Sequence, residues 1–285
     1  MNDQIKNFGA RPSKPDPRDF TPEHLTKRFE AAPTPFASRS PLTAPVYMQG
    51  EQPACGGHGG TTFWQALAQN GETLSPRFVY ALCKKIDGDS TPGTDGRSVM
   101  QVLQKYGVCT DALFPNDVTL SDADYADWTK IPPLAFVDAL SRRIGPYAQL
   151  TKMDFQTIKD NIFQNSVVLI AGQVGKEWWT GVNGVSSWES ADILPLRPPA
   201  VVVSGHFWVD FAFDQNLTYL RNSWSTAWGD DGNGEYGNNY TPYIFEAWVA
   251  QLPLPPAPSL PTNPTVPQIQ SWLVRLLVWL RLIKI

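Results

Sequence analysis

The sequence predicts an α+β fold, because helix signals gather in the first half of the chain and strand signals in the second. The helix signals lie between residues 55 and 107, whereas an apolar run and an alternating hairpin pattern lie between residues 166 and 224. A chain of 285 residues with 42% hydrophobic residues can bury one substantial core. We therefore expect two halves that share a core, with the active site in the cleft between them.

Two helices are predicted from their capping signals. The Ser-Pro dipeptide at 75–76 combines a capping serine with a proline at the first helical position, and it predicts a helix that continues to about Lys85. Ser98 and Gln101 have the spacing of a capping box, and apolar residues follow at helical spacing until a glycine ends the element. A further helix is expected to start at Cys55 and to continue through TTFWQALAQ.

The second half is predicted to form strands. After a short helix from Asp154, the run SVVLIAG is apolar almost throughout, as in a buried strand. In VVVSGHFWVDFAF the apolar residues alternate, and residues 214–216 form a turn before LTYLRNSW. An antiparallel hairpin centred on this turn places His206 nearly opposite Asn222 and Trp224, on the same face.

Four polar residues supply the groups that acyl transfer by a thiolate requires. Cys55 is the candidate nucleophile and His206 the candidate base, because an ordinary thiol has a pKa of about 8.5 and needs activation at neutral pH. A helix N-terminus at Cys55 and an imidazolium at His206 both favour the thiolate, so the ion pair is expected before substrate arrives. Gln49 and the backbone N–H of Cys55 are expected to donate to the oxyanion, and Asn222 to orient the base.

Two spacings and one motif connect these residues. Gln49 precedes Cys55 by six positions in QGEQPAC, and Asn222 follows His206 by sixteen positions and opens NSWSTAWGDDGNGEY. On these features the chain resembles the papain-like cysteine peptidases, especially their bacterial and viral branches. LSPRFVYALCKKIDG and GTDGRSVMQVLQKYGVC also resemble the helical half of that family. The resemblance covers roughly residues 41–251.

The resemblance implies a papain-like two-subdomain fold, in which an antiparallel, barrel-like β half follows a helical half. It implies hydrolysis of peptide or protein substrates through an acyl-enzyme intermediate, without a cofactor or a metal ion. It also implies that Asn222 holds the imidazole ring N–H and that Trp224 shields this hydrogen bond from water. In the loop GDSTPGTDGRS, Gly93 and Gly96 are the candidates for contact with an extended substrate, and an ordinary turn is the alternative.

The chain departs from the family pattern around the nucleophile. Pro53 and Ala54 stand where the family usually has Gly-Ser, and four glycines and a histidine at residues 56–60 follow Cys55. Each glycine inside a helix costs roughly 1 kcal/mol relative to alanine, so this turn either begins irregularly or depends on close packing. Gln52 replaces a cysteine that commonly forms a family disulfide.

Several other residues have a structural reading and a functional one. His58 is expected to be an ordinary solvated or core histidine rather than a group that tunes the thiolate. Asp210 is an alternative orienter of the base, which the family spacing disfavours. Cys83 and Cys109 are expected to be buried thiols rather than a disulfide. The three tryptophans of GKEWWTGVNGVSSWES are expected to pack on the β half rather than to line a substrate groove.

Charge and composition argue against several classes of protein. A net charge of −4 and a pI near 5.4 give no electrostatic reason to expect nucleic acid as a partner. Only three cysteines are present, which indicates neither a disulfide-rich scaffold nor a zinc site. The first twenty residues lack the apolar region of a signal peptide, so a cytoplasmic location is expected.

The two ends of the chain are predicted to lie outside the peptidase domain at residues 41–251. Residues 1–40 are expected to be an N-terminal extension or a short pro-segment. Residues 252–267 are dense in proline, which predicts a semi-rigid linker. Residues 268–285 are almost wholly apolar but too short to span a bilayer. They are expected to bind a partner, to self-associate or to associate peripherally with a membrane, and packing on their own domain is the alternative.

Two alternatives to an active peptidase remain open. One is a binding or assembly module that keeps the fold and has lost efficient catalysis, and the other is a Cys-His amidase that acts on cell-wall peptides. Retention of all four polar residues favours an enzyme, whereas the glycine run favours the inactive module. The Asn-Ser-Trp motif favours the papain-like class over the amidase, although a triad does not define bond specificity.

Overall fold

A computed structural model of the chain describes residues 8–25, 38–39, 42–178 and 196–253. Residues 1–251 form one compact unit, and residues 252–285 form a second, nearly all of which lies outside the described residues. The expectations for the linker and for the apolar C-terminal segment therefore stay predictions. Within the described ranges, none of the helices combines the length and the hydropathy that a membrane-spanning segment needs.

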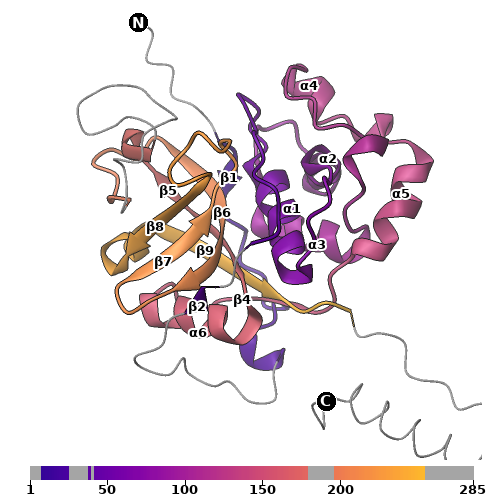
Figure 1. Cartoon of the computed structure of the whole chain (residues 1–285). Helices are drawn as coiled ribbons and strands as arrows, with labels where there is room; N and C mark the ends of the chain where they lie inside the picture. Colours follow the sequence, from indigo (N-terminus) through magenta and orange to yellow (C-terminus); the bar gives the residue numbers. More distant parts are fainter. Residues whose placement is uncertain (1–7, 26–37, 40–41, 179–195, 254–285) are drawn as a thin grey trace, which may run out of the picture. The chain divides into compact units, whose positions relative to one another are not determined.

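The first unit has a helical half and a β half, which lie side by side in Figure 1. Helix α1 contacts both other long helices of the helical half and also the sheet of the β half. The helices of the helical half are α1 (Cys55–Ala68), α2 (Pro76–Asp87), α3 (Gly96–Lys105), α4 (Asp122–Tyr125) and α5 (Pro133–Ala139), with the 3-10 helices η2 (Asp111–Leu113), η3 (Trp128–Lys130) and η4 (Leu140–Arg142).

A seven-stranded antiparallel sheet forms the β half, in the order β4-β9-β5-β6-β7-β8, with β2 paired to β6. Its strands are β2 (Ser38–Arg39), β4 (Tyr147–Gln149), β5 (Val168–Val174), β6 (Ser204–Phe213), β7 (Leu217–Arg221), β8 (Asn233–Gly237) and β9 (Ile244–Ala250). The remaining described elements are α6 (Phe155–Asn165), η1 (Pro22–His24), η5 (Lys176–Trp178), η7 (Asn238–Tyr243) and a separate parallel pair, β1 (Ala10–Arg11) and β3 (Thr94–Asp95). The predicted α+β class is confirmed.

The glycine run of α1 is explained by close packing. A Cβ added at Gly57 would lie 2.5 Å from the Pro76 carbonyl oxygen, and one at Gly60 would lie 2.5 Å from a Val99 methyl group. Both distances are shorter than a real Cβ contact, so α2 and α3 approach α1 only because these positions lack side chains. Close packing, rather than an irregular start of the helix, therefore explains the glycine run. Helix α1 begins at Cys55 as predicted.

One predicted helix start is correct and the other is wrong. The Ser75 hydroxyl accepts the Phe78 backbone N–H at 3.0 Å and caps α2, as expected. Helix α3 begins at Gly96 rather than after Ser98, because the Asp95 carboxylate accepts the Ser98 N–H at 2.9 Å and takes the capping position. The Ser98 hydroxyl instead donates to Asp87, at 2.7 Å.

The hairpin that carries the predicted base has the expected register near the site. Val209 pairs with Arg221, which fits a hairpin centred on residue 215. Between Asp210 and Ala212 the register shifts by a bulge that the alternating pattern did not predict. Strand β6 is also buried on both faces near the site, because aromatic side chains cover the face that carries His206.

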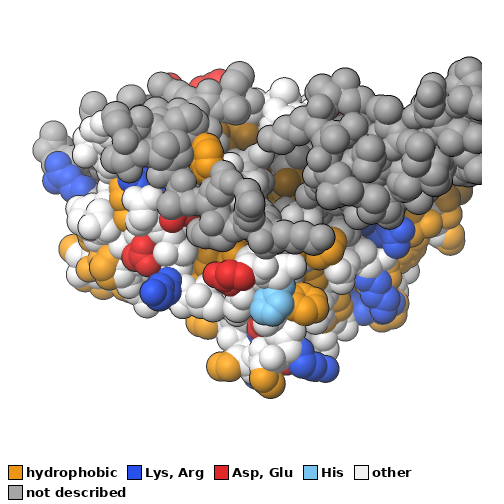
Figure 2. Space-filling model, turned by 90° about the horizontal axis from the view of Figure 1, so that it is seen from below, with side chains coloured by type: hydrophobic (Ala, Val, Ile, Leu, Met, Phe, Trp, Pro, Cys, Tyr) orange, Lys and Arg blue, Asp and Glu red, His pale blue; other side chains and the backbone are white. Residues whose placement is uncertain are grey.

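Cys83, Cys109 and Trp178 have the buried positions that the sequence predicts. Cys83 and Cys109 are free and buried, so no disulfide joins them. Trp178 is buried among aromatic rings of the β half, whereas the other two tryptophans of its segment lie outside the described residues. On the face drawn in Figure 2, acidic and basic side chains are interspersed among apolar ones.

Candidate active site

A hydrogen bond joins the predicted base to its predicted orienter. His206 Nε2 lies 2.7 Å from Asn222 Oδ1. The same oxygen accepts the Ser223 backbone N–H at 2.7 Å, so it is the acceptor in both contacts. His206 Nε2 therefore carries the proton, and the neutral ring presents Nδ1 as an acceptor. This Nδ1 is buried and has no hydrogen-bond partner in the described structure, so its lone pair is available to accept a proton.

Aromatic rings enclose this histidine. The Trp224 ring lies 4.6 Å from the His206 ring between centroids, with 32° between the two planes. The rings of Trp178 and Phe8 lie 6.0 and 5.4 Å from it, both edge-on. Trp224 is fully buried beside the histidine, where the resemblance expects a shield for the hydrogen bond to Asn222. Asp210, the alternative orienter, accepts hydrogen bonds from Trp208 and Tyr236 instead.

Cys55 is the first residue of α1 and is fully buried. Burial raises the pKa of the Cys55 thiol, and the backbone N–H of Phe207, the neighbour of His206 in β6, lowers it by less. Burial also lowers the pKa of His206, to about 3, against the smaller opposing effect of the Asn222 hydrogen bond. Both groups are therefore neutral in the described state, and the expectation of an ion pair before substrate arrives does not hold there.

Hydrogen bonds connect Gln49, the candidate oxyanion donor, to the Asn-Ser-Trp motif that carries Asn222. The Gln49 backbone N–H donates to the Ser223 carbonyl at 2.9 Å, and the Ser223 hydroxyl donates to Gln49 Oε1 at 2.8 Å. Gln49 Nε2 donates to the Gln52 carbonyl at 3.0 Å. An amide nitrogen carries two hydrogens, so the second remains for an oxyanion. Ser223 is the middle residue of the Asn-Ser-Trp motif, and the sequence reasoning gave it no role of its own.

The chain's own N-terminal residues occupy the cleft. The Phe8 carbonyl oxygen accepts the Cys55 backbone N–H at 3.2 Å, which is the donor expected for the oxyanion. The Phe8 N–H donates to the Ser204 hydroxyl at 2.9 Å. Next to it, the Gly9 carbonyl accepts the Thr94 N–H at 2.8 Å, and β1 continues along β3. Phe8 thus contacts both Cys55 and the His206 ring, and it contributes to the burial that displaces their pKa values.

The two candidate substrate glycines have different surroundings. Gly93 has a positive φ of 87°, and a Cβ there would lie 2.1 Å from the Gly9 carbonyl oxygen, so residue 93 permits close approach of an extended segment. Gly96 lies at the start of α3, where its N–H donates to Glu246 at 2.7 Å. The backbone group that pairs with the N-terminal segment belongs to Thr94, which the sequence reasoning missed because a threonine carries no signal of close approach.

His58 has a structural role in this geometry. Its ring is fully buried one turn after Cys55, and its Nδ1 lies 3.0 Å from the Ala54 carbonyl oxygen. A carbonyl only accepts, so Nδ1 carries the proton. Burial lowers the pKa of His58 to about 4, which keeps the ring neutral. This outcome agrees with the expectation of a core histidine.

The fold matches solved structures of cysteine proteases. Xylellain, a cysteine protease from Xylella fastidiosa, superposes with a TM-score of 0.68 at 21% identity over 88% of this chain and 97% of that one. A proCathepsin B from Trypanosoma congolense has a TM-score of 0.61 at 15% identity, with 87% of each chain covered. A cysteine protease from Carica candamarcensis, solved in complex with E-64, has a TM-score of 0.54 at 12% identity and covers 74% of this chain and 94% of that one.

No protein-family model matches the sequence, and no curated protein sequence matches it either. The structural likeness therefore stands on the fold, which is papain-like. The predicted two-half arrangement, with a helical half followed by an antiparallel β half, is confirmed. The likeness to papain-like cysteine peptidases that the motifs predicted is confirmed in the same sense.

Proposed function

We propose that this chain is a cysteine-type peptidase that hydrolyses peptide bonds through Cys55 and His206. The observation that carries the proposal is the hydrogen bond from His206 Nε2 to Asn222, which leaves a buried, unpartnered Nδ1 on the strand whose next residue contacts the Cys55 thiol. Nucleophile, base, orienter and oxyanion donors come from three separate segments of the papain-like fold. These are the groups that acyl transfer by a thiolate requires.

In the proposed reaction, His206 takes the Cys55 proton and the sulfur attacks the carbonyl carbon of the substrate. The oxygen of the tetrahedral intermediate accepts hydrogen bonds from the Cys55 N–H and from Gln49. The C–N bond then breaks as the His206 imidazolium protonates the leaving amine, and a thioester remains. Water, deprotonated by His206, attacks the thioester and releases the acid and the thiol. Peptides and proteins are the substrates we propose, in line with the proteases that share the fold.

The inactive module has less support than the enzyme. The glycine run after Cys55 favoured an inactive module, and close packing of α1 against α2 and α3 accounts for that run. The cell-wall amidase has no specific observation in its favour. The occupied cleft indicates instead that activity depends on displacement of residues 8–12.

Reaction with an epoxide inhibitor such as E-64 tests this proposal on the full-length chain. We expect slow but selective labelling of Cys55 at neutral pH, because the thiol is activated only when the N-terminal segment leaves the cleft. Cys83 and Cys109 should stay unlabelled, since burial raises the pKa of both thiols and no base is assigned to either. Intact mass and peptide mapping measure the labelled sites, and the denatured chain with a general alkylating reagent is the control that counts all three thiols. Absence of label on Cys55 in the folded chain contradicts the proposal.

A further inference from the structure

Asp210 is a fully buried carboxylate in the β half, and the proposed reaction does not use it. It lies on β6 four positions after His206, on the same face of the strand. Both of its hydrogen bonds come from uncharged aromatic side chains. Trp208 Nε1 donates to Oδ1 at 3.0 Å, and the Tyr236 hydroxyl donates to Oδ2. One carboxylate thus fixes the polar ends of two buried rings.

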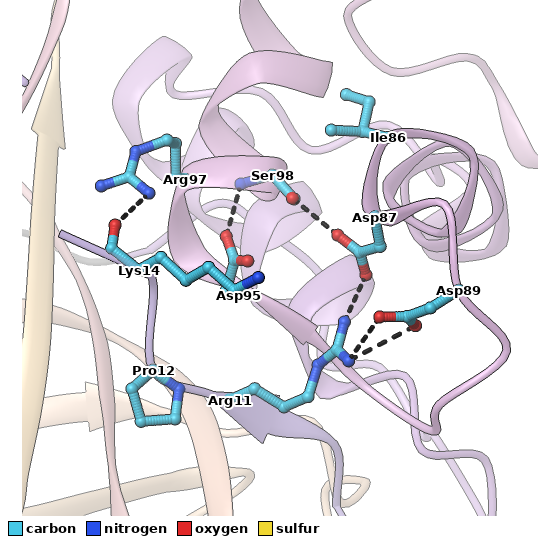
Figure 3. A pocket seen from close by; sticks show the side chains of 9 residues that line it. All are labelled: Arg11, Pro12, Lys14, Ile86, Asp87, Asp89, Asp95, Arg97 and Ser98. Carbon is cyan, nitrogen blue, oxygen red and sulfur yellow. Dashed lines mark hydrogen bonds and ion pairs between the residues drawn. The ribbon is translucent and has the colours of Figure 1, made fainter. Parts of the chain in front are cut away.

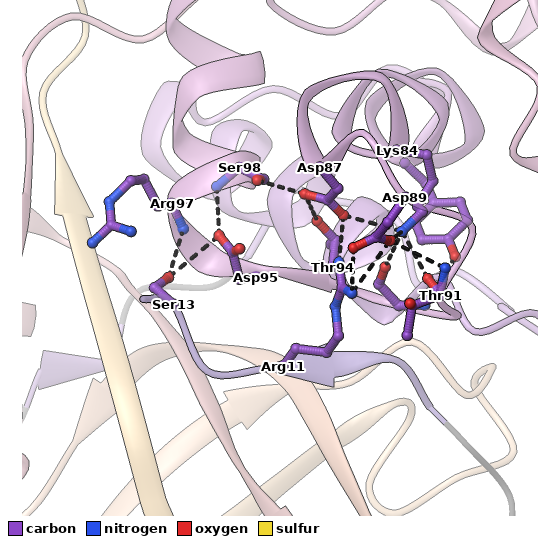
Figure 4. A network of polar contacts seen from close by, with 12 residues as sticks. Arg11, Ser13, Lys84, Asp87, Asp89, Thr91, Thr94, Asp95, Arg97 and Ser98 are labelled. Carbon is purple, nitrogen blue, oxygen red and sulfur yellow. Dashed lines mark hydrogen bonds and ion pairs between the residues drawn. The ribbon is translucent and has the colours of Figure 1, made fainter. Parts of the chain in front are cut away.

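Within the described residues, no ion pair reaches this carboxylate. Burial raises the pKa of Asp210 to about 8, and only its two hydrogen bonds oppose that shift. Asp87, the buried aspartate of the helical half, differs: Arg11 and Lys84 lie 2.7 and 3.2 Å from it. Figure 3 shows the Arg11 guanidinium pointing towards Asp87, and Figure 4 adds Lys84 on the same carboxylate.

The pairing in the β half is therefore one of mutual dependence. A buried carboxylate without a cation needs its hydrogen-bond donors, and a buried indole N–H needs an acceptor. The cross-strand neighbours of Asp210 in β5 and β7 are Val168 and Leu220, whose side chains offer the Trp208 indole no acceptor. Asp210 thus fixes where the Trp208 ring lies.

Trp208 in turn packs beside the candidate base. The ring centroids of Trp208 and His206 are 6.5 Å apart, with 30° between the planes. Trp178 packs on both rings, with its centroid 5.1 Å from that of Trp208 and 6.0 Å from that of His206. The Trp208 ring lies over Gly172, where a Cβ would be 2.4 Å from it, and Gly172 pairs with His206 between β5 and β6. We call Trp178 and Trp208 the aromatic wall.

The orientation of His206 depends on packing, because a single hydrogen bond holds its ring. Nε2 contacts Asn222, and Nδ1 has no partner in the described structure. Burial lowers the pKa of His206 to about 3, and the titratable His58 lowers it by less. Displacement of Trp208 would admit water beside the ring, weaken the hydrogen bond to Asn222 and raise the pKa towards its ordinary value.

We propose that Asp210 is a positioning residue for the candidate base, because it holds the aromatic wall that orients His206 towards Cys55. It acts through Trp208 and does not touch substrate or the reacting atoms. An asparagine at residue 210 keeps an acceptor for the indole and a polar partner for Tyr236, whereas a leucine removes both. The inference rests on the proposed function in that His206 is the base, but its first test needs no hydrolysis.

NMR of ¹⁵N-labelled histidine rings in the full-length chain provides this first test. The chain has three histidines, and His206→Ala identifies the signals of His206. In the wild-type chain we expect a neutral ring with the proton on Nε2 down to about pH 5. In Asp210→Leu the ring should be partly protonated at that pH and should exchange between tautomers, because its pKa rises towards about 6.5. Asp210→Asn should keep the wild-type signals. Unchanged His206 signals in folded Asp210→Leu overturn the proposal.

Asp214→Leu is the matched control. Asp214 follows β6 at the turn of the same hairpin and also accepts a tyrosine hydroxyl, from Tyr219 at 2.7 Å. This variant should leave the His206 signals unchanged, and thermal unfolding of each variant checks that the chain is folded. An equal change of the His206 signals in Asp214→Leu would assign the effect to general loss of stability and overturn the proposal.

Steady-state kinetics on a cleaved peptide provide the second test. In Asp210→Leu, kcat should fall about ten- to a hundredfold while KM stays within about twofold, because the base is misplaced and the substrate contacts remain. The double variant with Trp208→Phe should lose no more than the larger single loss, since the two residues act as one unit. Additive losses, or a change in KM alone, contradict the proposal. Failure of the proposed function would look different: no variant would hydrolyse a peptide, while the His206 signals would still respond to Asp210→Leu.

Discussion

Replacement of Cys55 by alanine is expected to reduce peptide hydrolysis by roughly 10⁴–10⁶, because the variant has no nucleophile to form the thioester. The measurement is digestion of a peptide library by the wild-type chain and by the Cys55→Ala chain, followed by mass spectrometry. The same digest also reports the preferred side chains around the cleaved bond.

Cys109→Ala is the control for this experiment. Cys109 is also a buried free thiol, but its backbone carbonyl accepts a hydrogen bond from the Ser75 N–H at the start of α2, and it takes no part in the proposed reaction. Its variant should therefore keep wild-type cleavage. Equal activity in the Cys55→Ala and wild-type chains would assign the cleavage to another group or to a contaminant.

Replacement of Gln49 by alanine is expected to lower kcat by roughly 10²–10³ and to leave KM nearly unchanged. The oxyanion exists only after attack, so the Gln49 donor stabilises the transition state more than the bound substrate. Steady-state kinetics on a peptide selected by the library digest separate the two constants. Gln215→Ala, at an exposed turn between β6 and β7, controls for loss of a glutamine. A change in KM alone would indicate that Gln49 binds substrate and does not stabilise the oxyanion.

The catalytic residues were predictable because their positions follow from spacing and hairpin register. Val209 pairs with Arg221, and this pairing brings His206 to Asn222 as the alternating pattern requires. The bulge at Phe211 was not predictable, because this residue lies between His206 and the turn in a stretch where the apolar alternation continues without interruption.

Other features depend on contacts that no local pattern encodes. The start of α3 was misplaced because both Asp95 and Ser98 are good capping residues. The sequence does not show that the Ser98 hydroxyl instead donates to Asp87, which lies in another helix. Residues 1–40 were expected to be an extension or a short pro-segment. The positions of residues 8–19 depend on partners such as Cys55 and Arg97, many positions away in the sequence. Contacts of Phe8 with Cys55 and His206 contribute to the burial that keeps both groups neutral in the described state.

The most direct test of the account is the pH dependence of Cys55 alkylation in the wild-type chain and in His206→Ala. The closed state raises the pKa of the thiol and protects it, so alkylation reports the chain in which residues 8–12 have left the cleft. There, an imidazolium beside the sulfur lowers the pKa of the thiol, and we predict that the wild-type rate rises at a pH well below the ordinary thiol value of about 8.5. In His206→Ala the rise should move up to that ordinary value. Identical profiles for the two chains, both rising near the ordinary thiol pKa, would contradict a Cys55–His206 pair.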